Sequence, residues 1–229
     1  MKLSVVIPAY NEEKTIREII ERVKAVQLQN KVEKEIIVVN DGSKDGTAKV
    51  LETYKLDKLI RIFYQNNMGK TGALITGIKN ATGDIILIQD ADLEYDPEYY
   101  PQLIEPILQQ KYSVVYGSRF KGNIKNMKLI NRLSNNFSNL IFSILFLTKI
   151  TDINTCFKAF KKEIIQPMEI KSSHFTFETE VTAKIIKQGI RILEIPIDYA
   201  ARSTEEGKKI NWSTALAMFW GIIKFRFSN

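Results

Sequence analysis

The sequence predicts a single α/β domain in which a mixed, mostly parallel β-sheet is flanked by helices. The chain has 229 residues, a length at which one domain with a sizeable core is expected. Short β-branched runs alternate with helical patterns through its first half, which is typical of strands joined by crossover helices. These runs are mostly apolar at both odd and even positions, and this indicates strands covered on both faces.

Apolar runs and their spacing place the individual elements. Strands are expected at residues 3–7, 35–39, 59–63, 84–89, 112–116, 155–160 and 190–195. A helix with Asn11 as its N-cap is expected to carry the apolar residues of 16–26, and a second helix those of 73–78. Pro97 suits the first position of a third helix. Gly189 is expected to end a helix at residues 177–188.

The alternation of strands and helices is lost after Gly117. A loop rich in Lys and Asn then leads into an apolar segment at residues 137–150. This segment is shorter than the roughly 20 apolar residues that a transmembrane helix needs. It is therefore either a buried helix or one that lies in a membrane interface. The tail, residues 211–229, has apolar residues at roughly helical spacing and is expected to form an amphipathic helix.

The chain is basic, with 33 Lys and Arg residues against 26 Asp and Glu residues and a formal net charge of +7. Such an excess points to nucleic acid, an anionic membrane surface or a phosphorylated ligand as the partner. Seven basic residues and no acidic residue lie between residues 106 and 151, so the whole excess can be assigned to this segment.

The sequence also bears on the compartment. A single cysteine, Cys156, excludes an intrachain disulfide and suggests reducing surroundings. The apolar run near the N-terminus is interrupted early by proline and acidic residues, unlike that of a signal peptide. We therefore expect a cytoplasmic protein.

The strongest local signal for a functional site is a short group of acidic residues. Asp90, Asp92 and Glu94 directly follow the apolar residues 85–88. Ligands of open α/β sheets bind beyond the carboxyl ends of strands, and a divalent cation would remove the mutual repulsion of three carboxylates there. Hard oxygen ligands suit Mg²⁺ or Mn²⁺. The alternative is a solvated acidic turn that caps the helix at Pro97.

Polar loops follow two other strands. Pro8, Tyr10 and Glu12 come after the first, and Asp41 comes after the second. Asp41 is either an acceptor of hydrogen bonds from a nucleoside or part of an ordinary Asp-Gly turn. The loops at these three strand ends could build one cleft.

Residues 66–71 superficially resemble a P-loop. The Walker pattern requires a glycine where this chain has Tyr64, so the P-loop interpretation is rejected. Lys70 is still expected to meet a phosphate, because it stands just before a predicted helix.

Taken together, the segments VVIPAYNEE, VVNDGSKDGT, NMGKTGALITGIKNATGD and QDADLEYDP, in this order and spacing, resemble a family 2 glycosyltransferase of the GT-A fold. The later VYGSRF, TDINTCFKAF and FETE segments, with Tyr199, Arg202 and Lys208, narrow the resemblance to the dolichol-phosphate mannose synthase-like branch. The resemblance extends from Leu3 to about Trp212. It implies a polyprenyl-phosphate glycosyltransferase with a single GT-A catalytic domain.

The resemblance implies a nucleotide-sugar donor and a metal, Mg²⁺ or Mn²⁺. The metal is expected on Asp90, Asp92 and Glu94. Relatives near mannose synthase often have glutamine where Glu94 stands, so the donor stays open: GDP-mannose is favoured, with UDP-glucose or another UDP-sugar as the alternative. The residues expected to bind the donor are Pro8, Tyr10, Glu12, Val39, Asp41, Lys70, Asp90, Ala91 and Asp92.

The expected acceptor is a polyprenyl or dolichyl phosphate. A phosphate is already anionic at neutral pH, so the enzyme needs cations to position it. The residues expected to bind it are Ser118, Arg119, Arg132, Arg202 and Lys208, and those expected to be catalytic are Asp92, Arg119, Glu178, Arg202 and Lys208. A saccharide hydroxyl acceptor, the alternative, would need a general base, for which the candidates are Glu178, Glu180 or an acid near Asp90 and Asp92. His174, the only histidine, is not expected to act in catalysis.

The membrane is the last expected partner. Residues 119–150 and 211–229 are expected to contact a membrane surface, with ordinary core packing as the alternative, and the protein is expected to be peripheral at the cytoplasmic face. A nucleic-acid-binding module would show a steep salt dependence of binding. The acidic strand-end segment and the lack of an interleaved aromatic platform argue against that partner. Oligomeric state is not predicted.

Overall fold

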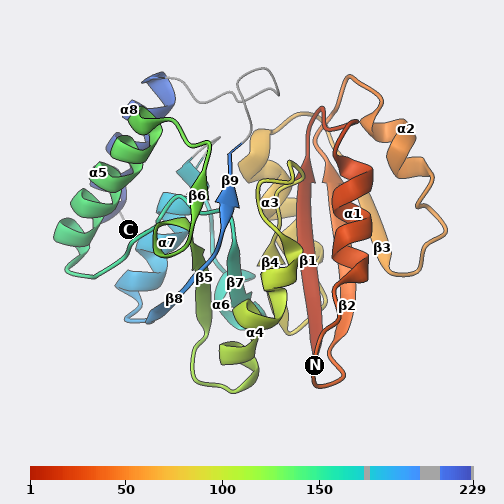
Figure 1. The fold of residues 1–229 in the computed structure, drawn as a ribbon, viewed down its shortest axis with the longest axis horizontal. Helices are drawn as coiled ribbons and strands as arrows, with labels where there is room; N and C mark the ends of the chain where they lie inside the picture. The colour runs from red at the N-terminus through yellow and green to blue at the C-terminus, as the bar shows by residue number, and fades with distance from the viewer. Residues whose placement is uncertain (173–175, 202–211, 228–229) are drawn as a thin grey trace.

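Seven strands form one mixed sheet in the order β3-β2-β1-β4-β7-β5-β8 (Figure 1). The structure is a computed structural model that describes residues 1–172, 176–201 and 212–227, with side chains omitted for 212–219. The strands are β1 (Lys2–Ala9), β2 (Glu33–Asn40), β3 (Ile60–Tyr64), β4 (Ile85–Ile88), β5 (Val114–Ser118), β7 (Lys158–Lys161) and β8 (Ile192–Pro196). Strand β7 runs antiparallel to both neighbours, and the other pairs in this sheet are parallel. All seven predicted strands are confirmed, with ends shifted by up to three residues.

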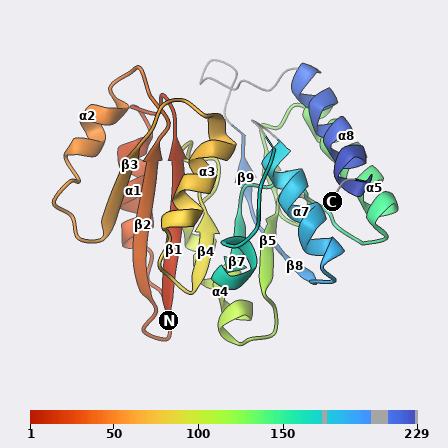
Figure 2. The ribbon, with the colours of Figure 1, turned by 180° about the vertical axis from the view of Figure 1, so that it is seen from behind.

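Helices cover both faces of the sheet, as Figures 1 and 2 show from opposite sides. Their bounds are α1 (Ile16–Ala25), α2 (Thr47–Glu52), α3 (Gly69–Asn80), α4 (Tyr100–Leu108), α5 (Leu129–Phe146), α6 (Lys162–Ile165), α7 (Phe177–Lys187) and α8 (Trp212–Phe227). Two apolar cores result. Helices α1, α2 and α4 contribute to one, and α3, α5, α6, α7 and α8 contribute to the other. The predicted single α/β domain is therefore confirmed.

The strands supply both cores by simple alternation. Val5 and Ile7 of β1 point into the core of α1 and α4, whereas Val6 between them points into the core of α3. All three are fully buried. This two-sided burial explains why the strand sequences are apolar at both parities.

Helix boundaries differ from the prediction at two places. Asn11 does not cap α1: its φ is +57° and its side chain accepts a hydrogen bond from the Lys44 backbone N–H, so Thr15 precedes the helix instead. Helix α5 begins at Leu129 and takes up part of the loop expected before residue 137. Gly189 does end α7, with a φ of +73° that only glycine adopts without strain.

Pro97 stands at the first position of a short 3₁₀-helix, Pro97–Tyr99, which leads directly into α4. The Asp96 carboxylate accepts a hydrogen bond from the Glu98 N–H at 3.1 Å and caps this turn. The capping role foreseen for the acidic segment therefore belongs to Asp96, which leaves the preceding carboxylates for other contacts.

A second, two-stranded parallel sheet pairs β6 (Ile124–Lys125) with β9 (Tyr199–Ala200). It brings the segment after β8 against the segment after β5. In the described part of the chain, no helix combines the length and hydropathy needed to cross a bilayer.

Candidate active site

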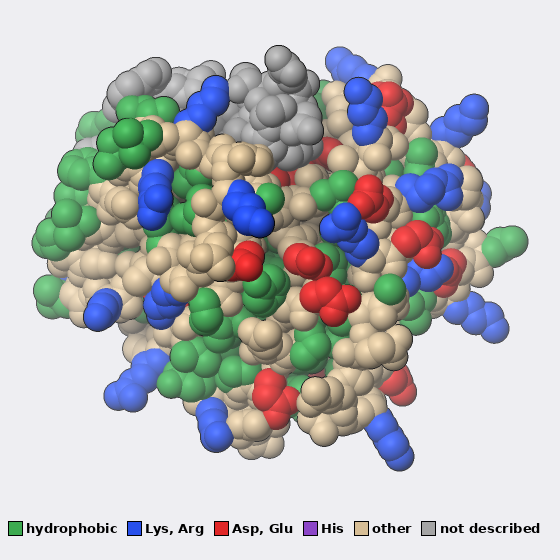
Figure 3. All heavy atoms as spheres, in the orientation of Figure 1, with side chains coloured by type: hydrophobic (Ala, Val, Ile, Leu, Met, Phe, Trp, Pro, Cys, Tyr) green, Lys and Arg blue, Asp and Glu red, His purple; other side chains and the backbone are tan. Residues whose placement is uncertain are grey.

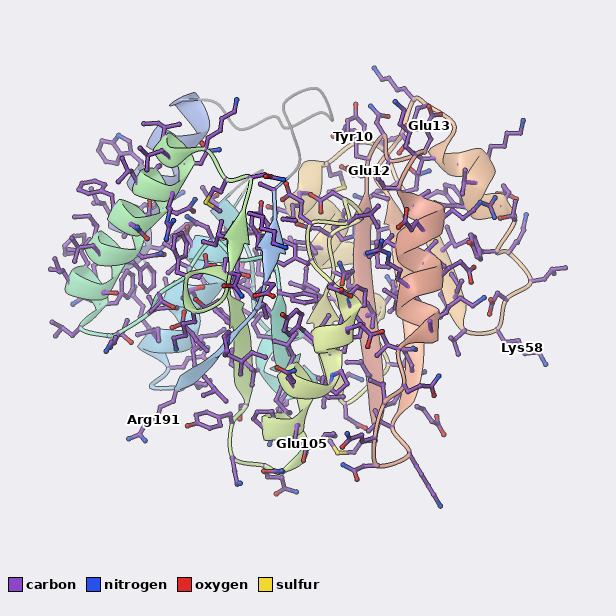
Figure 4. All side chains as sticks on the ribbon, viewed as in Figure 1. Tyr10, Glu12, Glu13, Lys58, Glu105 and Arg191 are labelled. Atoms are coloured by element: carbon purple, nitrogen blue, oxygen red, sulfur yellow. The ribbon has the colours of Figure 1, made fainter. Side chains whose placement is uncertain are left out.

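The candidate site lies where the strand order reverses. The chain runs from β1 outward to β2 and β3 and then returns to β4 on the other side of β1. Ligands of open α/β sheets bind at such a point, beyond the carboxyl ends of the strands. Figure 4 shows Tyr10 and Glu12 at this edge, with Glu105 and Arg191 near the opposite one.

The loops after β1 and β2 form one continuous surface. Pro8 pairs in register with Val39, so these two predicted donor-binding residues are neighbours on adjacent strands. The Asn11 N–H donates to Ser43 Oγ at 3.0 Å, and the Glu12 N–H donates to Thr47 Oγ1 at 2.9 Å. The sequence-predicted loops are thus joined by hydrogen bonds that fix their relative position.

Asp41 is directed inward rather than into open solvent. Its side chain and backbone are nearly inaccessible at 2% exposure. One carboxylate oxygen accepts hydrogen bonds from Gln65 Nε2 at 2.7 Å and from the Met68 N–H at 2.8 Å. Asp41 therefore holds the loop before α3. Gly42 has a φ of +71°, and a Cβ there would lie 2.9 Å from Asn67 N, so this turn requires glycine.

A cluster of opposite charges occupies the end of β4. Lys70 Nζ, in the first turn of α3, lies 2.8 Å from an oxygen of Asp90 and 3.4 Å from Glu178 Oε1. It also lies 2.9 Å from Cys156 Sγ. The lysine thus bridges the first carboxylate of the acidic segment and the buried glutamate at the start of α7.

The charge state of the cluster follows from its partners. Burial alone would lower the pKa of Lys70, but the neighbouring carboxylates of Asp90 and Glu178 raise it well above its ordinary value. Burial and Asp90 raise the pKa of the Cys156 thiol, although Lys70 opposes this. At neutral pH the lysine is therefore a cation and the cysteine a neutral thiol.

The remaining two carboxylates of the acidic segment have separate contacts. Asp92 Oδ1 accepts a hydrogen bond from the Glu94 N–H at 3.1 Å. Glu94 Oε2 accepts a hydrogen bond from the Tyr199 hydroxyl at 2.6 Å. Ala91 between the first two is buried. In the described part of the chain these three carboxylates are not arranged as one metal site, and their role as metal ligands stays a prediction.

A metal still fits this segment in a different way. Among the residues that the structure describes, no group of three or more His, Cys, Asp and Glu side chains is arranged to hold a metal ion. Mg²⁺ and Mn²⁺ sites that bind phosphorylated substrates often use only one or two carboxylates, with phosphate oxygens and water completing the shell. Asp90 has a side-chain exposure of 14% and hard oxygen donors, so Asp90 and Asp92 suit such a site.

Arg119, one of the predicted acceptor residues, is held by several hydrogen bonds to a single carboxylate. Its Nε and Nη2 donate to the two oxygens of Asp152 at 2.8 and 2.7 Å, and its backbone N–H donates to the same carboxylate at 3.0 Å. Arg119 is 6% exposed and Asp152 fully buried. The guanidinium also lies 5.1 Å from the centre of the Tyr199 ring. The charge expected to meet a phosphate is thus already paired inside the protein.

Of the other predicted acceptor and base residues, the structure describes Ser118, Arg132 and Glu180. Ser118 is buried and its hydroxyl lies 2.7 Å from that of Thr151. Arg132 is exposed on α5. Glu180 is 1% exposed and accepts hydrogen bonds from the Lys171 and Ser172 N–H groups, so it anchors that turn and is not a candidate base. Arg202, Lys208 and His174 lie outside the described residues.

Sequence reasoning did not assign roles to Cys156, Asp152 and Lys158. Lys158 is fully buried, donates to the carbonyl oxygens of Ile153 and Thr155, and lies 4.1 Å from the Tyr116 ring centre. Burial lowers its pKa to about 8. The TDINTCFKAF segment contains all three residues, but nothing in it distinguishes buried ionisable groups from exposed ones.

A sequence model of the family described as "Glycosyl transferase family 2" matches residues 4–168. A dolichol-phosphate mannosyltransferase of Pyrococcus furiosus is 33% identical over 217 residues, which are 91% of this chain and 59% of that protein. This chain therefore spans less than two thirds of that relative. A UDP-N-acetylglucosamine–dolichyl-phosphate N-acetylglucosaminyltransferase of Methanococcus voltae is 33% identical over 213 residues, 84% of this chain and 83% of that one.

A solved structure shares the fold. Glucosyl-3-phosphoglycerate synthase from Mycobacterium tuberculosis, in complex with Mn²⁺, UDP and phosphoglyceric acid, matches with a TM-score of 0.77 and 18% identity. The match covers 99% of this chain and 78% of that one. The same enzyme has been crystallised with Mg²⁺ and UDP. At this identity the likeness supports the chain's architecture.

Proposed function

The chain belongs to glycosyl transferase family 2 and has the GT-A fold, and from this membership we propose that it transfers a hexose from a nucleotide sugar to a polyprenyl or dolichyl phosphate. GDP-mannose is the favoured donor. The observation that carries the proposal is the charged cluster of Lys70, Asp90 and Glu178 at the reversal of strand order. Two relatives named for dolichyl phosphate acceptors support the choice of acceptor.

The donor would lie across the ends of β1, β2 and β4. Pro8, Val39 and the loop bearing Tyr10 and Glu12 would receive the nucleoside, because they form one hydrogen-bonded surface beside the acidic segment. Lys70 would exchange its contact with Asp90 for one with the donor's diphosphate. It stands at the N-terminus of α3, where backbone N–H groups also favour an anion.

Asp90 and Asp92 would hold Mg²⁺ or Mn²⁺. When bound, such an ion offsets the negative charge that builds up on the departing nucleoside diphosphate. Support comes from the oxygen chemistry of these two side chains and from neighbours of the same fold crystallised with Mn²⁺ or Mg²⁺. Glu94 would act on the site indirectly, by accepting the hydrogen bond from the Tyr199 hydroxyl.

The proposed reaction is a single displacement with inversion. An oxygen of the acceptor phosphate forms a bond to the anomeric carbon, while the bond from that carbon to the donor's diphosphate breaks and the leaving oxygen keeps the electron pair. No proton has to be removed from an ionised phosphate. Arg132, Arg202 and Lys208 would supply acceptor-side cations, and Arg119 would position Tyr199 and the neighbouring backbone through Asp152.

The direct test is identification of the product. The full chain is incubated with Mn²⁺, a panel of GDP- and UDP-sugars and a short polyprenyl phosphate in detergent, and the lipid fraction is analysed by mass spectrometry. We expect the lipid phosphate to gain the mass of one hexose, with GDP-mannose as the best donor. A UDP-sugar as best donor would change the donor assignment. No lipid-linked sugar from any donor would refute the proposal.

A hydroxyl acceptor is the second candidate, favoured by one observation: Glu178 is 6% exposed and lies in the same charged cluster as Asp90. A general base would give a bell-shaped dependence of kcat/KM on pH. For a phosphate acceptor we expect Glu178→Gln to lower the rate without changing the shape of that profile. Loss of the acidic limb in Glu178→Gln, but not in the exposed control Glu163→Gln, would favour the hydroxyl acceptor.

A further inference from the structure

Helix α5 carries apolar side chains on its solvent side as well as on its inner side. Apolar residues spaced alternately by three and four positions point to solvent, and each is more than half exposed: Ile130, Leu133, Phe137, Leu140 and Ile144 of α5, and Leu147 directly after it. The inner side combines the core residues Phe142 and Phe146 with buried polar groups. Asn139 is 5% exposed; its Nδ2 donates to the Thr151 carbonyl and its Oδ1 accepts from the Ile153 N–H. A helix that packs on a core and faces water normally has polar residues on its outer side.

Helix α8 extends this apolar surface. It packs beside α5 at one end of the molecule, as Figures 1 and 2 both show. Its described side chains include Trp220 and Phe227, which are 69% and 79% exposed. Figure 3 shows apolar side chains gathered along the edge where α5 lies. We call the five α5 residues and Leu147, together with Trp220 and Phe227, the α5–α8 face. An apolar patch of this kind marks an interaction surface.

The charged residues of α5, of α8 and of residues 119–128 before α5 are all basic. Neither α5 nor α8 contains an Asp or Glu residue. Basic residues lie at the start of α5, just before it, and in the last turn of α8: Lys125, Lys128, Arg132, Lys224 and Arg226. The Arg226 guanidinium lies 5.8 Å from the ring centre of Phe146 and 6.0 Å from that of Phe227. The partner must therefore be apolar at its centre and anionic at its border.

We propose that the α5–α8 face docks into the headgroup boundary of a bilayer that contains anionic lipid. Helices with an apolar face and basic flanks lie in this region, each basic residue adds attraction to anionic headgroups, and aromatic residues such as Trp220 favour the interface. A second copy of the chain fits less well, because two such faces would bring basic residues together without acidic partners.

Docking of the α5–α8 face rests on the proposed function, because a polyprenyl phosphate acceptor resides in a bilayer. It also connects the membrane with the site. Asn139 holds the backbone on both sides of Asp152, and Asp152 holds Arg119. A docked α5 would therefore keep the acceptor side of the site at the bilayer surface, where the lipid phosphate lies.

Vesicle flotation of the full chain tests the proposal without nucleotide or polyprenyl phosphate. The probes are phosphatidylcholine vesicles with and without about 30% phosphatidylglycerol, which gives the vesicle a negative surface like that of an anionic leaflet. We expect binding to the anionic vesicles, and at least about a tenfold lower partition for the triple variant Phe137→Ser/Leu140→Ser/Ile144→Ser. The control Leu56→Ser removes an apolar side chain that is 94% exposed elsewhere and should bind as wild type.

Variants that remove basic residues provide a second test of the same proposal. Lys125→Gln/Lys224→Gln should lower partition by about fivefold for each base removed, whereas Lys31→Gln/Lys58→Gln, on the far part of the surface, should not. Wild-type protein that stays unbound with both vesicles would overturn the proposal. So would a serine variant that binds as wild type, or one that instead turns a dimer into a monomer by light scattering. Transfer in detergent is measured separately, so failure of docking and failure of the proposed reaction are distinguishable.

Discussion

Asp90→Asn is expected to lower kcat/KM for sugar transfer by about 10²–10³-fold, the range associated with loss of one group that stabilises developing charge. The substitution keeps the shape of the side chain but removes the charge that pairs with Lys70 and that would hold a divalent cation. We also expect the dependence of the rate on Mn²⁺ to shift to higher concentration. Steady-state kinetics across a Mn²⁺ titration measure both effects.

The matched control for this prediction lies at the other end of the same strand. Asp84 precedes β4 and accepts a hydrogen bond from the Lys2 N–H at 2.9 Å, so Asp84→Asn should leave the rate unchanged. Asp92→Ala, measured in parallel, should also lose metal-dependent transfer. Normal metal-dependent rates in both Asp90→Asn and Asp92→Ala would show that the acidic segment does not hold the metal.

Arg119→Met is expected to lower the free energy of unfolding by about 3–5 kcal/mol, because it leaves the carboxylate of Asp152 buried without its ionic partner. The side-chain hydrogen bonds at 2.7 and 2.8 Å are lost, and Asp152 has no access to solvent. Urea denaturation followed by circular dichroism measures the change. The exposed control Arg132→Met should change stability by no more than about 0.5 kcal/mol.

A double variant separates the buried charge from simple loss of packing. Arg119→Met/Asp152→Leu removes both ions, so it should recover most of the stability that Arg119→Met loses. A single Arg119→Met variant as stable as wild type would mean that water or another cation reaches Asp152. A double variant no more stable than the single one would assign the loss to the contact of Arg119 with Tyr199.

Much of the fold could be predicted because its signals are local. The apolar residues of β1 at both parities required a strand between two layers, and the apolar spacing of α1 required one buried face. The polar loops after β1, β2 and β4 could be placed at one edge, because carboxyl ends of parallel strands meet there. The start of α1 was predicted wrongly, since Asn11 bonds to the Lys44 backbone, a contact distant in sequence.

The order of residues along the chain thus determined the element types, the edge that carries the loops and the family. Only the tertiary structure decided which charges meet. Strand β7 enters antiparallel between β4 and β5, which brings Cys156 to the end of β4 beside Lys70. Asp152 neutralises Arg119, and α5 turns Asn139 inward while Leu140 and Ile144 face solvent. The physical reason is that periodicity shows how a segment folds locally, whereas pairing and burial depend on partners far away in the sequence.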